Sequence, residues 1–182
     1  MNSDRIMVVG CPGSGKTTFA TRLGKILGRE VIHLDKLLWL PDWQMMDYSR
    51  RKEIHDGIIG NSQWIIDGMW RSHVAERIER ATAVFFLDYP RRVCMMRAIK
   101  RRIRFHGKQR YDIAHGCKEK LDGYFLKYIY NFRRNVRPYL VGQLQLHAEH
   151  LDLVTFRRPK EAEKFLADME QRYKSTVNDT DK

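Results

Sequence analysis

The sequence has few cysteines and no long apolar run. Three cysteines, at positions 11, 94 and 117, are spread over 182 residues, and they form neither a C-x-x-C pair nor a disulfide framework. No apolar stretch approaches the ~18 residues of a membrane span, and the first expected strand begins so early that we expect no signal peptide. These absences argue against a disulfide scaffold or a membrane protein and favour a reduced, cytoplasmic protein.

Acidic residues are also scarce. The chain has 34 Lys and Arg against 22 Asp and Glu, which gives a formal net charge of +12. Residues 91–110 contain nine Lys or Arg and no acid. A solvated basic helix face explains part of this cluster. Such a positive field attracts polyphosphates, so the charge predicts either a nucleotide or a nucleic acid as partner.

Residues 10–17 read Gly-Cys-Pro-Gly-Ser-Gly-Lys-Thr, a complete match to G-x-x-x-x-G-K-[ST]. An apolar strand over 5–9 precedes the match, and helical periodicity over 16–27 follows it, which is the context of a phosphate-binding loop. Lys16 is expected to reach the β- and γ-phosphates of ATP, and the Thr17 hydroxyl to help bind Mg²⁺. Cys11 is expected to be a small structural residue. The residues assigned to the nucleotide here are Gly10, Gly13, Ser14, Gly15, Lys16, Thr17 and Thr18.

Strands and helices alternate along the rest of the chain. We expect further strands over 30–34, 64–66, 83–87 and 151–156, and helices over 48–60, 72–80, 90–105, 119–146 (broken or kinked at Pro138) and 159–173. This order predicts an α/β fold of the three-layer P-loop NTPase type, with a mainly parallel five-stranded sheet and helices on both faces. Residues 1–173 are expected to form a single domain with a mobile, lid-like segment at about 104–118, and 174–182 a disordered tail.

Several polar residues follow the expected strands. In such sheets, ligands gather at the carboxyl ends of the strands, where Gly10, Asp35, Asp67 and Asp88 are placed. Asp67 and Asp88 are both candidates for positioning Mg²⁺. We favour Asp67, because Arg71 follows it closely, whereas Asp88 alternatively caps the basic helix.

Two segments resemble nucleoside monophosphate kinases. Asp67-Gly-Met-Trp-Arg71 resembles the D-G-x-x-R segment of adenylate kinase, which implies that Asp67 lies near Mg²⁺ and that Arg71 holds the acceptor phosphate. Asp88-Tyr-Pro followed by Arg97-x-x-x-Arg101-Arg102 is similar to the segment before the lid of that family. This likeness implies that Arg97 stacks on the ATP base and that the later arginines contact phosphates.

With the segment His33-Leu-Asp-x-Leu-x-Trp39 added, residues 5–170 resemble the DNA topology modulation proteins, small adenylate-kinase-like P-loop proteins. Two departures concern the acceptor side. The segment 106–117 is short for a lid and lacks a four-cysteine zinc pattern. The usual Thr-Gly start of the acceptor segment is replaced by Asp35 and the tryptophans at 39 and 43, so we expect an acceptor other than AMP.

Asp35 is expected to orient or deprotonate an acceptor hydroxyl, or else to cap a helix. Trp39 and Trp43 would stack on a base or sugar, or simply pack in the core or lid. Arginines are candidates for stabilising the transferring phosphoryl group, and among them we select Arg101 and Arg134. Arg157 follows the last strand and is a candidate for a nucleobase contact.

The function predicted from these residues is that of an ATP-Mg²⁺-dependent phosphotransferase acting on a nucleotide-like or hydroxyl-bearing small molecule, as a monomer or a homodimer. The alternative is an ATP-binding, nucleic-acid-associated regulator that affects DNA topology. A GTPase is disfavoured, because the chain has no N-K-x-D segment to read guanine.

Overall fold

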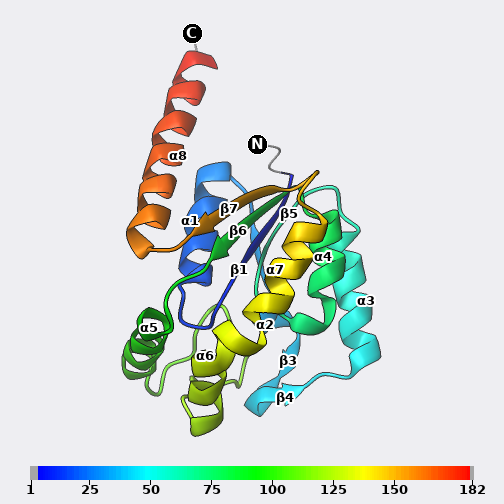
Figure 1. Ribbon diagram of the computed structural model, residues 1–182, viewed down its shortest axis with the longest axis vertical. Helices are drawn as coiled ribbons and strands as arrows, with labels where there is room; N and C mark the ends of the chain where they lie inside the picture. Colours follow the sequence, from blue (N-terminus) through cyan, green and yellow to red (C-terminus); the bar gives the residue numbers. More distant parts are fainter. Residues whose placement is uncertain (1–3, 181–182) are drawn as a thin grey trace.

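A five-stranded parallel sheet forms the centre of the molecule (Figure 1). The computed structural model describes residues 4–180, and side chains through residue 175. The strand order is β2-β5-β1-β6-β7. The strands are β1 (Arg5–Gly10), β2 (Val31–His33), β5 (Trp64–Asp67), β6 (Ala83–Leu87) and β7 (Asp152–Phe156). The predicted fold class is therefore confirmed.

Helices cover both faces of this sheet. One face carries α1 (Lys16–Leu27) and α8 (Pro159–Thr180), and the other carries α3 (Tyr48–Ile59), α4 (Val74–Arg80) and α7 (Arg137–Leu146). The helices α5 (Arg91–Arg104) and α6 (Gly123–Asn135) pack on each other beyond the carboxyl ends of the strands (Figure 1). This places the basic helix α5 at the edge of the sheet where ligands bind in such folds.

The burial of the central strand β1 explains why helices cover both faces of the sheet. Side chains of a strand alternate between its faces, and every residue from Ile6 to Gly10 is buried. Ile6 and Val8 join a core with helices α1, α6 and α8, whereas Met7 and Val9 join a second core with α3, α4 and α7. A strand buried on both sides reads as a continuous apolar run, as Ile6-Met-Val-Val9 does.

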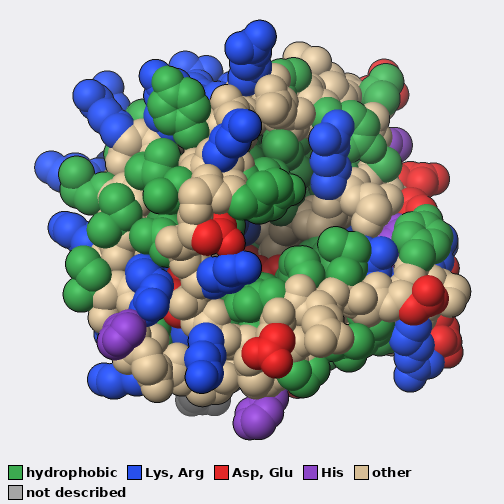
Figure 2. Space-filling view, turned by 90° about the horizontal axis from the view of Figure 1, so that it is seen from below, with side chains coloured by type: hydrophobic (Ala, Val, Ile, Leu, Met, Phe, Trp, Pro, Cys, Tyr) green, Lys and Arg blue, Asp and Glu red, His purple; other side chains and the backbone are tan. Residues whose placement is uncertain are grey.

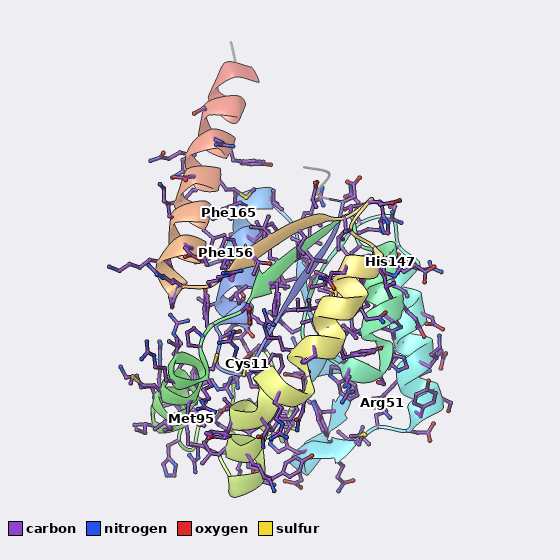
Figure 3. The ribbon with its side chains drawn as sticks, in the orientation of Figure 1. Cys11, Arg51, Met95, His147, Phe156 and Phe165 are labelled. Atoms are coloured by element: carbon purple, nitrogen blue, oxygen red, sulfur yellow. The ribbon has the colours of Figure 1, made fainter. Side chains whose placement is uncertain are left out.

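Phenylalanine rings join α8 to α1 and the sheet. The rings of Phe156 on β7 and Phe165 on α8 lie 5.4 Å apart, and both contact Phe19 of α1 (Figure 3). Phe85 on β6 completes the cluster, 5.2 Å from Phe19. Tilted aromatic contacts of this kind add to the free energy gained by burying the rings.

Several element boundaries differ from the sequence-based expectation. The segment 36–47, which lies in none of the expected strands or helices, contains the end of helix α2 (Leu34–Leu37). It also contains a hairpin of β3 (Trp39–Leu40) and β4 (Gln44–Met45) around the 3-10 turn Pro41–Trp43. A second 3-10 turn, Arg71–His73, precedes α4. The helical region expected over 119–146 begins at Gly123, because Asp122 caps α6 by accepting a hydrogen bond from the Phe125 amide (2.8 Å). The break predicted at Pro138 is confirmed, since α6 ends at Asn135 and Pro138 lies in the first turn of α7.

The last helix is longer than expected. It was predicted to end at Tyr173 but continues to Thr180, so the tail from Lys174 is helical as far as that residue. Lys174 donates to Glu170 one turn earlier (2.9 Å), and such a pair supports a helix. Residues 181–182 lie outside the described residues. Along residues 4–180, none of the helices is both long enough and apolar enough to cross a bilayer.

Candidate functional site

The loop between β1 and α1 passes so close to its neighbours that it requires glycine. Gly13 has φ +81°, and a Cβ there would lie 2.2 Å from the Cys94 carbonyl oxygen of α5. At Gly10 a Cβ would meet the Leu87 carbonyl oxygen at 2.6 Å. Gly15, also at positive φ, precedes the first residue of α1, so the free amides of the first helical turn face the cavity described below. This is the geometry of an anion-binding loop, as the sequence predicts.

Side chains of the loop and of α5 are held together beside it. Lys16 Nζ donates to the Cys11 carbonyl (3.2 Å), which keeps the ammonium over the loop. Arg97 Nη1 donates to the Ser14 carbonyl (2.9 Å), and its guanidinium lies 5.6 Å from the centre of the Tyr89 ring. The Ser14 hydroxyl is buried without a hydrogen-bond partner. An unpaired buried hydroxyl is a group that a phosphate oxygen would satisfy.

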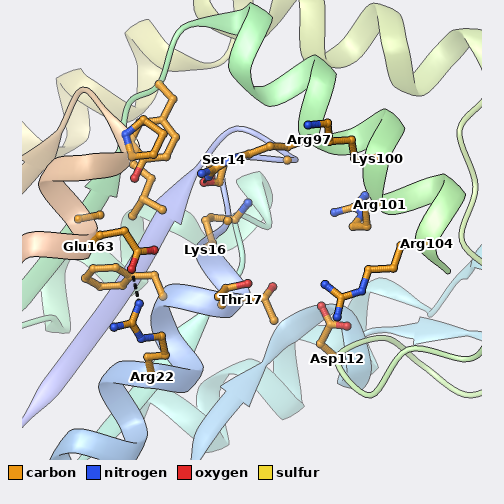
Figure 4. Close-up of a pocket in the computed structure, with 18 of the residues that line it drawn as sticks. Ser14, Lys16, Thr17, Arg22, Arg97, Lys100, Arg101, Arg104, Asp112 and Glu163 are labelled. Carbon is orange, nitrogen blue, oxygen red and sulfur yellow. Dashed lines mark hydrogen bonds and ion pairs between the residues drawn. The ribbon is translucent and has the colours of Figure 1, made fainter. Parts of the chain in front are cut away.

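A cavity of about 580 Å³ opens beside this loop, with basic residues of α5 across from it (Figure 4). Lys16 and Thr17 line one side, and Arg97, Lys100 and Arg101 line the other. The face at the carboxyl ends of the strands is hollowed near its centre, and Lys and Arg side chains lie around the hollow (Figure 2). Positive charge on two sides of one cavity suits a polyphosphate. Of the residues assigned to the nucleotide, the cavity is lined by Gly13, Ser14, Gly15, Lys16, Thr17, Thr18 and Arg97.

Asp67 closes β5 next to the loop, and only one of its carboxylate oxygens is engaged. Oδ2 lies 3.0 Å from His33 Nδ1, whereas Oδ1 is buried without a hydrogen-bond partner. Because strands β5 and β1 are neighbours with Asp67 beside Val8, the carboxylate lies near the start of α1. A free carboxylate oxygen together with the Thr17 hydroxyl fits Mg²⁺, which takes oxygen ligands and retains several waters. The contact of His33 with Asp67 was not predicted from the sequence.

Asp35 lies in the first turn of α2, directly after β2. Its side chain is exposed to solvent, although neighbouring protein atoms partly desolvate the carboxylate. This desolvation, together with the nearby charge of Asp67, raises the pKa of the Asp35 carboxyl, while Lys16 and Arg110 oppose the shift. Asp35 does not line the cavity beside the loop, and Lys16 affects its carboxyl only through its charge. A carboxylate with a raised pKa is suited to accept a proton.

Asp88, the rival candidate for Mg²⁺, is already paired. Arg137 of α7 binds both of its oxygens, through Nε at 2.9 Å and Nη2 at 2.7 Å. The N-terminus of α5 has no side-chain cap, so Asp88 does not cap the basic helix either. Because Asp88 is paired with Arg137, Asp67 is the better placed carboxylate for Mg²⁺. The same ion pair engages Arg137, one of the arginines considered for the transferring phosphoryl group.

An ion-pair network fixes the segment that follows α5. Arg101 Nε donates to Glu119 Oε1 (2.7 Å), and Arg110 Nη1 donates to Glu119 Oε2 (2.5 Å). Arg110 also forms a paired contact with Asp112. Arg110, Asp112 and Glu119 are buried, and Arg110 and Asp112 line the cavity. Sequence reasoning missed these three residues. The Arg-x-Asp pair, in a segment flanked by glycines, was a signal for an ion pair. The mobility expected of this segment stays a prediction.

Other residues predicted for the site lie outside the cavity. Arg71 is exposed, with its guanidinium 5.2 Å from the centre of the Tyr139 ring. Arg134, near the end of α6, is exposed, and so is Arg157, whose backbone amide donates to Glu161 (2.7 Å). None of the three lines the cavity beside the loop. Their roles stay predictions, and they would require movement or a bound acceptor to bring them to the phosphates.

The tryptophans after Asp35 hold the segment 106–117 in place. Trp39 and Trp43 meet edge to face at 5.5 Å and pack against Ile113, Ala114 and Cys117. Trp43 Nε1 donates to the Lys118 carbonyl (2.7 Å). Of the two roles left open for these rings, the packing contacts favour the lid-closing one.

Cys11 is buried and packs against α5 and α6. Its thiol lies 3.9 Å from the Ile129 carbonyl oxygen, and the neighbouring Cys94 thiol together with burial raises the pKa of Cys11. The thiol is therefore protonated, which agrees with a structural role. Figure 3 shows its position at the loop, beneath the ends of the strands.

Comparison with known proteins agrees with this site. The chain matches an AAA domain family, AAA_18, over residues 6–114, from β1 through the segment that follows α5. A search of curated proteins gave no match. The matched region covers more than half of the chain and includes the phosphate-binding loop, Asp35, Asp67 and α5. The chain therefore belongs to the AAA_18 family of AAA domains, a P-loop NTPase-like family.

Proposed function

We propose that this protein is an ATP-Mg²⁺-dependent phosphotransferase whose acceptor is a small, nucleotide-like or hydroxyl-bearing molecule. The observation that carries the proposal is the arrangement of opposed groups in one site. The phosphate-binding loop faces the basic residues of α5 across a cavity, and the charge of Lys16 acts on the carboxyl of Asp35, which lies outside the lining of the cavity. A carboxyl with a raised pKa that senses the charge of Lys16 supports catalysis over ATP binding alone.

On the donor side, the loop amides and Lys16 hold the β- and γ-phosphates. Arg97 flanks the base, and Arg101 approaches the transferring group from α5. Thr17 and Asp67 would hold Mg²⁺, which offsets the charge of the phosphates when it is bound. The expected gain from such groups is electrostatic, because phosphoryl transfer needs positioning and charge stabilisation more than covalent help.

On the acceptor side, Asp35 accepts the proton of the attacking hydroxyl. The acceptor oxygen forms a bond to the γ-phosphorus, the bond from that phosphorus to the bridging oxygen breaks, and ADP leaves with the electron pair. Asp35 then carries the proton. If the acceptor is instead a nucleoside monophosphate, its phosphate oxygen needs no base, and Asp35 would only orient the ribose.

The test is acceptor-dependent release of ADP. The protein is mixed with ATP and Mg²⁺, and with nucleosides, nucleoside monophosphates and small sugars in turn, while thermal unfolding reports ATP binding separately. At ATP one hundred times above its Kd, binding stabilises by about 2.7 kcal/mol. We expect at least one acceptor to raise ADP release well above the hydrolysis seen without it.

Lys16→Ala is the matched control, since it removes only the side chain that reaches the phosphates. It should lose both the thermal stabilisation by ATP and the ADP release. Equal stabilisation of both proteins would place the nucleotide elsewhere. Stabilisation of the wild-type protein without acceptor-dependent release across the panel would contradict the phosphotransferase and leave a binding protein.

Nucleic-acid binding is a second candidate, favoured by the exposure of the basic residues on α5. Arg91, Arg92, Lys100 and Arg104 are exposed. A nucleic-acid regulator should bind DNA or RNA with an affinity that falls steeply as salt rises. Negligible binding of both at low salt would rule this function out.

A further inference from the structure

A second buried polar cluster lies away from the phosphate site, between α3 and the segment that follows β5. His55 comes from the middle of α3, His73 from the end of the 3-10 turn, and Glu76 from the first turn of α4. The two imidazoles are fully buried, and their ring centres are 4.8 Å apart. Nothing in the proposed phosphotransfer uses them.

Buried nitrogens without partners concentrate in this cluster. In the part of the chain whose side chains are described, ten buried side-chain N or O atoms have no hydrogen-bond partner, and six of them are here. They are Arg51 Nε, His55 Nε2, His73 Nδ1, His73 Nε2, Arg77 Nε and Arg77 Nη1. Buried polar groups in native proteins nearly always have partners. His73, with both ring nitrogens unpaired at 1% exposure, is the clearest exception.

Three of the six unpaired atoms are imidazole nitrogens, and the other three are guanidinium N–H groups. A neutral imidazole presents one nitrogen lone pair, which is the form that binds metal ions. The unpaired imidazole nitrogens of His55 and His73 therefore fit a metal ion, whereas the guanidinium groups of Arg51 and Arg77 only donate hydrogen bonds and do not count toward it.

The geometry points to a metal ion. One nitrogen of each ring and a carboxylate oxygen of Glu76 all lie within 4.8 Å of one another, and His55 Nδ1 is 3.5 Å from Glu76 Oε2. Two imidazoles bound at about 2.1 Å to one tetrahedral Zn²⁺ have ring centres roughly 5 Å apart, close to the observed separation. We propose that His55, His73 and Glu76 form a binding site for Zn²⁺ or a similar transition-metal dication.

Asp56 completes the site from α3. Its Oδ1 lies 3.2 Å from His55 Nδ1, so it can orient the His55 ring or act as a fourth ligand. Two neutral imidazoles and two carboxylates are a ligand set that suits zinc.

Positively charged side chains around the site oppose metal binding, and Lys52 competes with the metal for the carboxylates. Lys52 Nζ lies 2.7 Å from Asp56 Oδ2 and 3.3 Å from Glu76 Oε2, where it neutralises both carboxylates. Its side chain is 38% exposed, so it can swing into solvent when a metal arrives. Arg77 cannot move into solvent in this way, because it is buried and its Nη2 donates to the Met69 and Trp70 carbonyls (2.6 and 3.0 Å). The metal therefore competes with Lys52 for the carboxylates.

Metal bound here would fix the segment that follows β5. His73 lies six residues after Asp67, and Arg77 already ties α4 to the carbonyls between them. A bound ion would fasten this connection to α3. The proposed role is structural, independent of whether the protein transfers phosphate.

The experiment uses the full chain, stripped of metal and without nucleotide. Zn²⁺ is titrated against a chromophoric chelator, Co²⁺ is followed by visible absorption, and thermal unfolding is recorded with and without Zn²⁺. We expect one ion per chain, a higher Tm with Zn²⁺, and a Co²⁺ spectrum without sulfur charge-transfer bands.

Variants identify the ligands. Glu76 is partly exposed, so Glu76→Gln should fold and weaken zinc binding by about 100-fold or more, whereas Asp56→Asn should weaken it by about 10-fold. Lys52→Met should tighten binding, because it removes the competitor. The matched control is the double variant His147→Ala/His150→Ala, which removes a histidine pair with ring centres 5.4 Å apart at the end of α7 and should bind zinc as the wild type does.

Absence of saturable zinc binding in the wild-type protein would overturn the proposal. It would also be overturned by sulfur charge-transfer bands in the Co²⁺ spectrum, by wild-type affinity in Glu76→Gln, or by loss of binding in the His147/His150 control.

Discussion

His33 Nδ1 lies 3.0 Å from Asp67 Oδ2, while Asp67 Oδ1 is buried and has no partner. The two residues end neighbouring strands, with His33 beside Asp67 in the register of β2 and β5. The imidazole engages one oxygen and leaves the other without a partner. This arrangement supports the Mg²⁺ role proposed for Asp67, with His33 as the residue that would orient it.

His33→Ala should therefore weaken the Mg²⁺ dependence of ATP turnover. Loss of an orienting partner usually reduces metal affinity or activity by about 10- to 100-fold, so we expect the Mg²⁺ concentration needed for half-maximal turnover to rise by roughly that factor. His150→Ala, an exposed histidine far along the chain, is the control and should be unaffected. An unchanged Mg²⁺ requirement in His33→Ala would show that Asp67 needs no support or does not face the ion.

Asp35→Asn should abolish acceptor-dependent turnover and yet stabilise the protein. Because the pKa of Asp35 is raised in the folded chain, the folded state holds a proton that the unfolded state has released, and stability falls as pH rises through the window between the two pKa values. Above this window the ionised carboxylate destabilises the folded state fully, so Asn should raise the Tm there. The gain should shrink when the pH is lowered toward the ordinary pKa of Asp.

ATP binding is the control measurement. Asp35→Asn should retain it, since in the proposed site the loop and Lys16 hold the donor phosphates. A variant that lost ATP binding, or one whose Tm gain were the same at acidic and neutral pH, would contradict this account of Asp35.

Gly13→Ala should abolish nucleotide binding. The added Cβ would lie 2.2 Å from the Cys94 carbonyl oxygen, and the backbone is at φ +81°. Gly28→Ala is the matched control, because Gly28 also has positive φ (+64°) but no atom within 4 Å of the added Cβ. It should cost only the conformational strain, about 1 kcal/mol, and keep ATP binding. Thermal unfolding with and without ATP separates the two effects.

The sequence was sufficient for the sheet and the phosphate loop, because both depend on local signals. The apolar run at 6–9 and the glycines at 10, 13 and 15 each carry their physical requirement in the residues themselves. The positions of Asp35 and Asp67 followed from a topological rule, since strand ends meet at one edge of a parallel sheet; their roles stay predictions.

What the sequence did not reveal depends on contacts between distant segments. His33 reads as a packed strand residue, and only pairing of β2 with β5 brings it to Asp67. The hairpin at 39–45 has strands of two residues each, too short for periodicity to detect. In the sequence, Arg110 belongs to a run of basic residues that is typical of a solvated helix face. Its burial depends on the ion pair with Glu119, nine residues later, which the sequence does not show.

Glu119→Ala should destabilise the protein strongly, because Glu119 is the one carboxylate that joins Arg101 to Arg110. Its side chain is 2% exposed, and Arg110 is also buried, so the variant leaves a buried guanidinium short of a partner. Breaking a buried ion pair from one side typically costs about 3–5 kcal/mol. Asp112 still binds Arg110, so we expect the lower end, about 3 kcal/mol in the free energy of unfolding measured with urea. Glu53→Ala removes an exposed carboxylate that pairs with Arg50 and should cost less than about 1 kcal/mol. Equal losses in the two variants would mean that the network is no more than a surface contact, and Arg101 would then be free to move to the phosphates without leaving a partner behind.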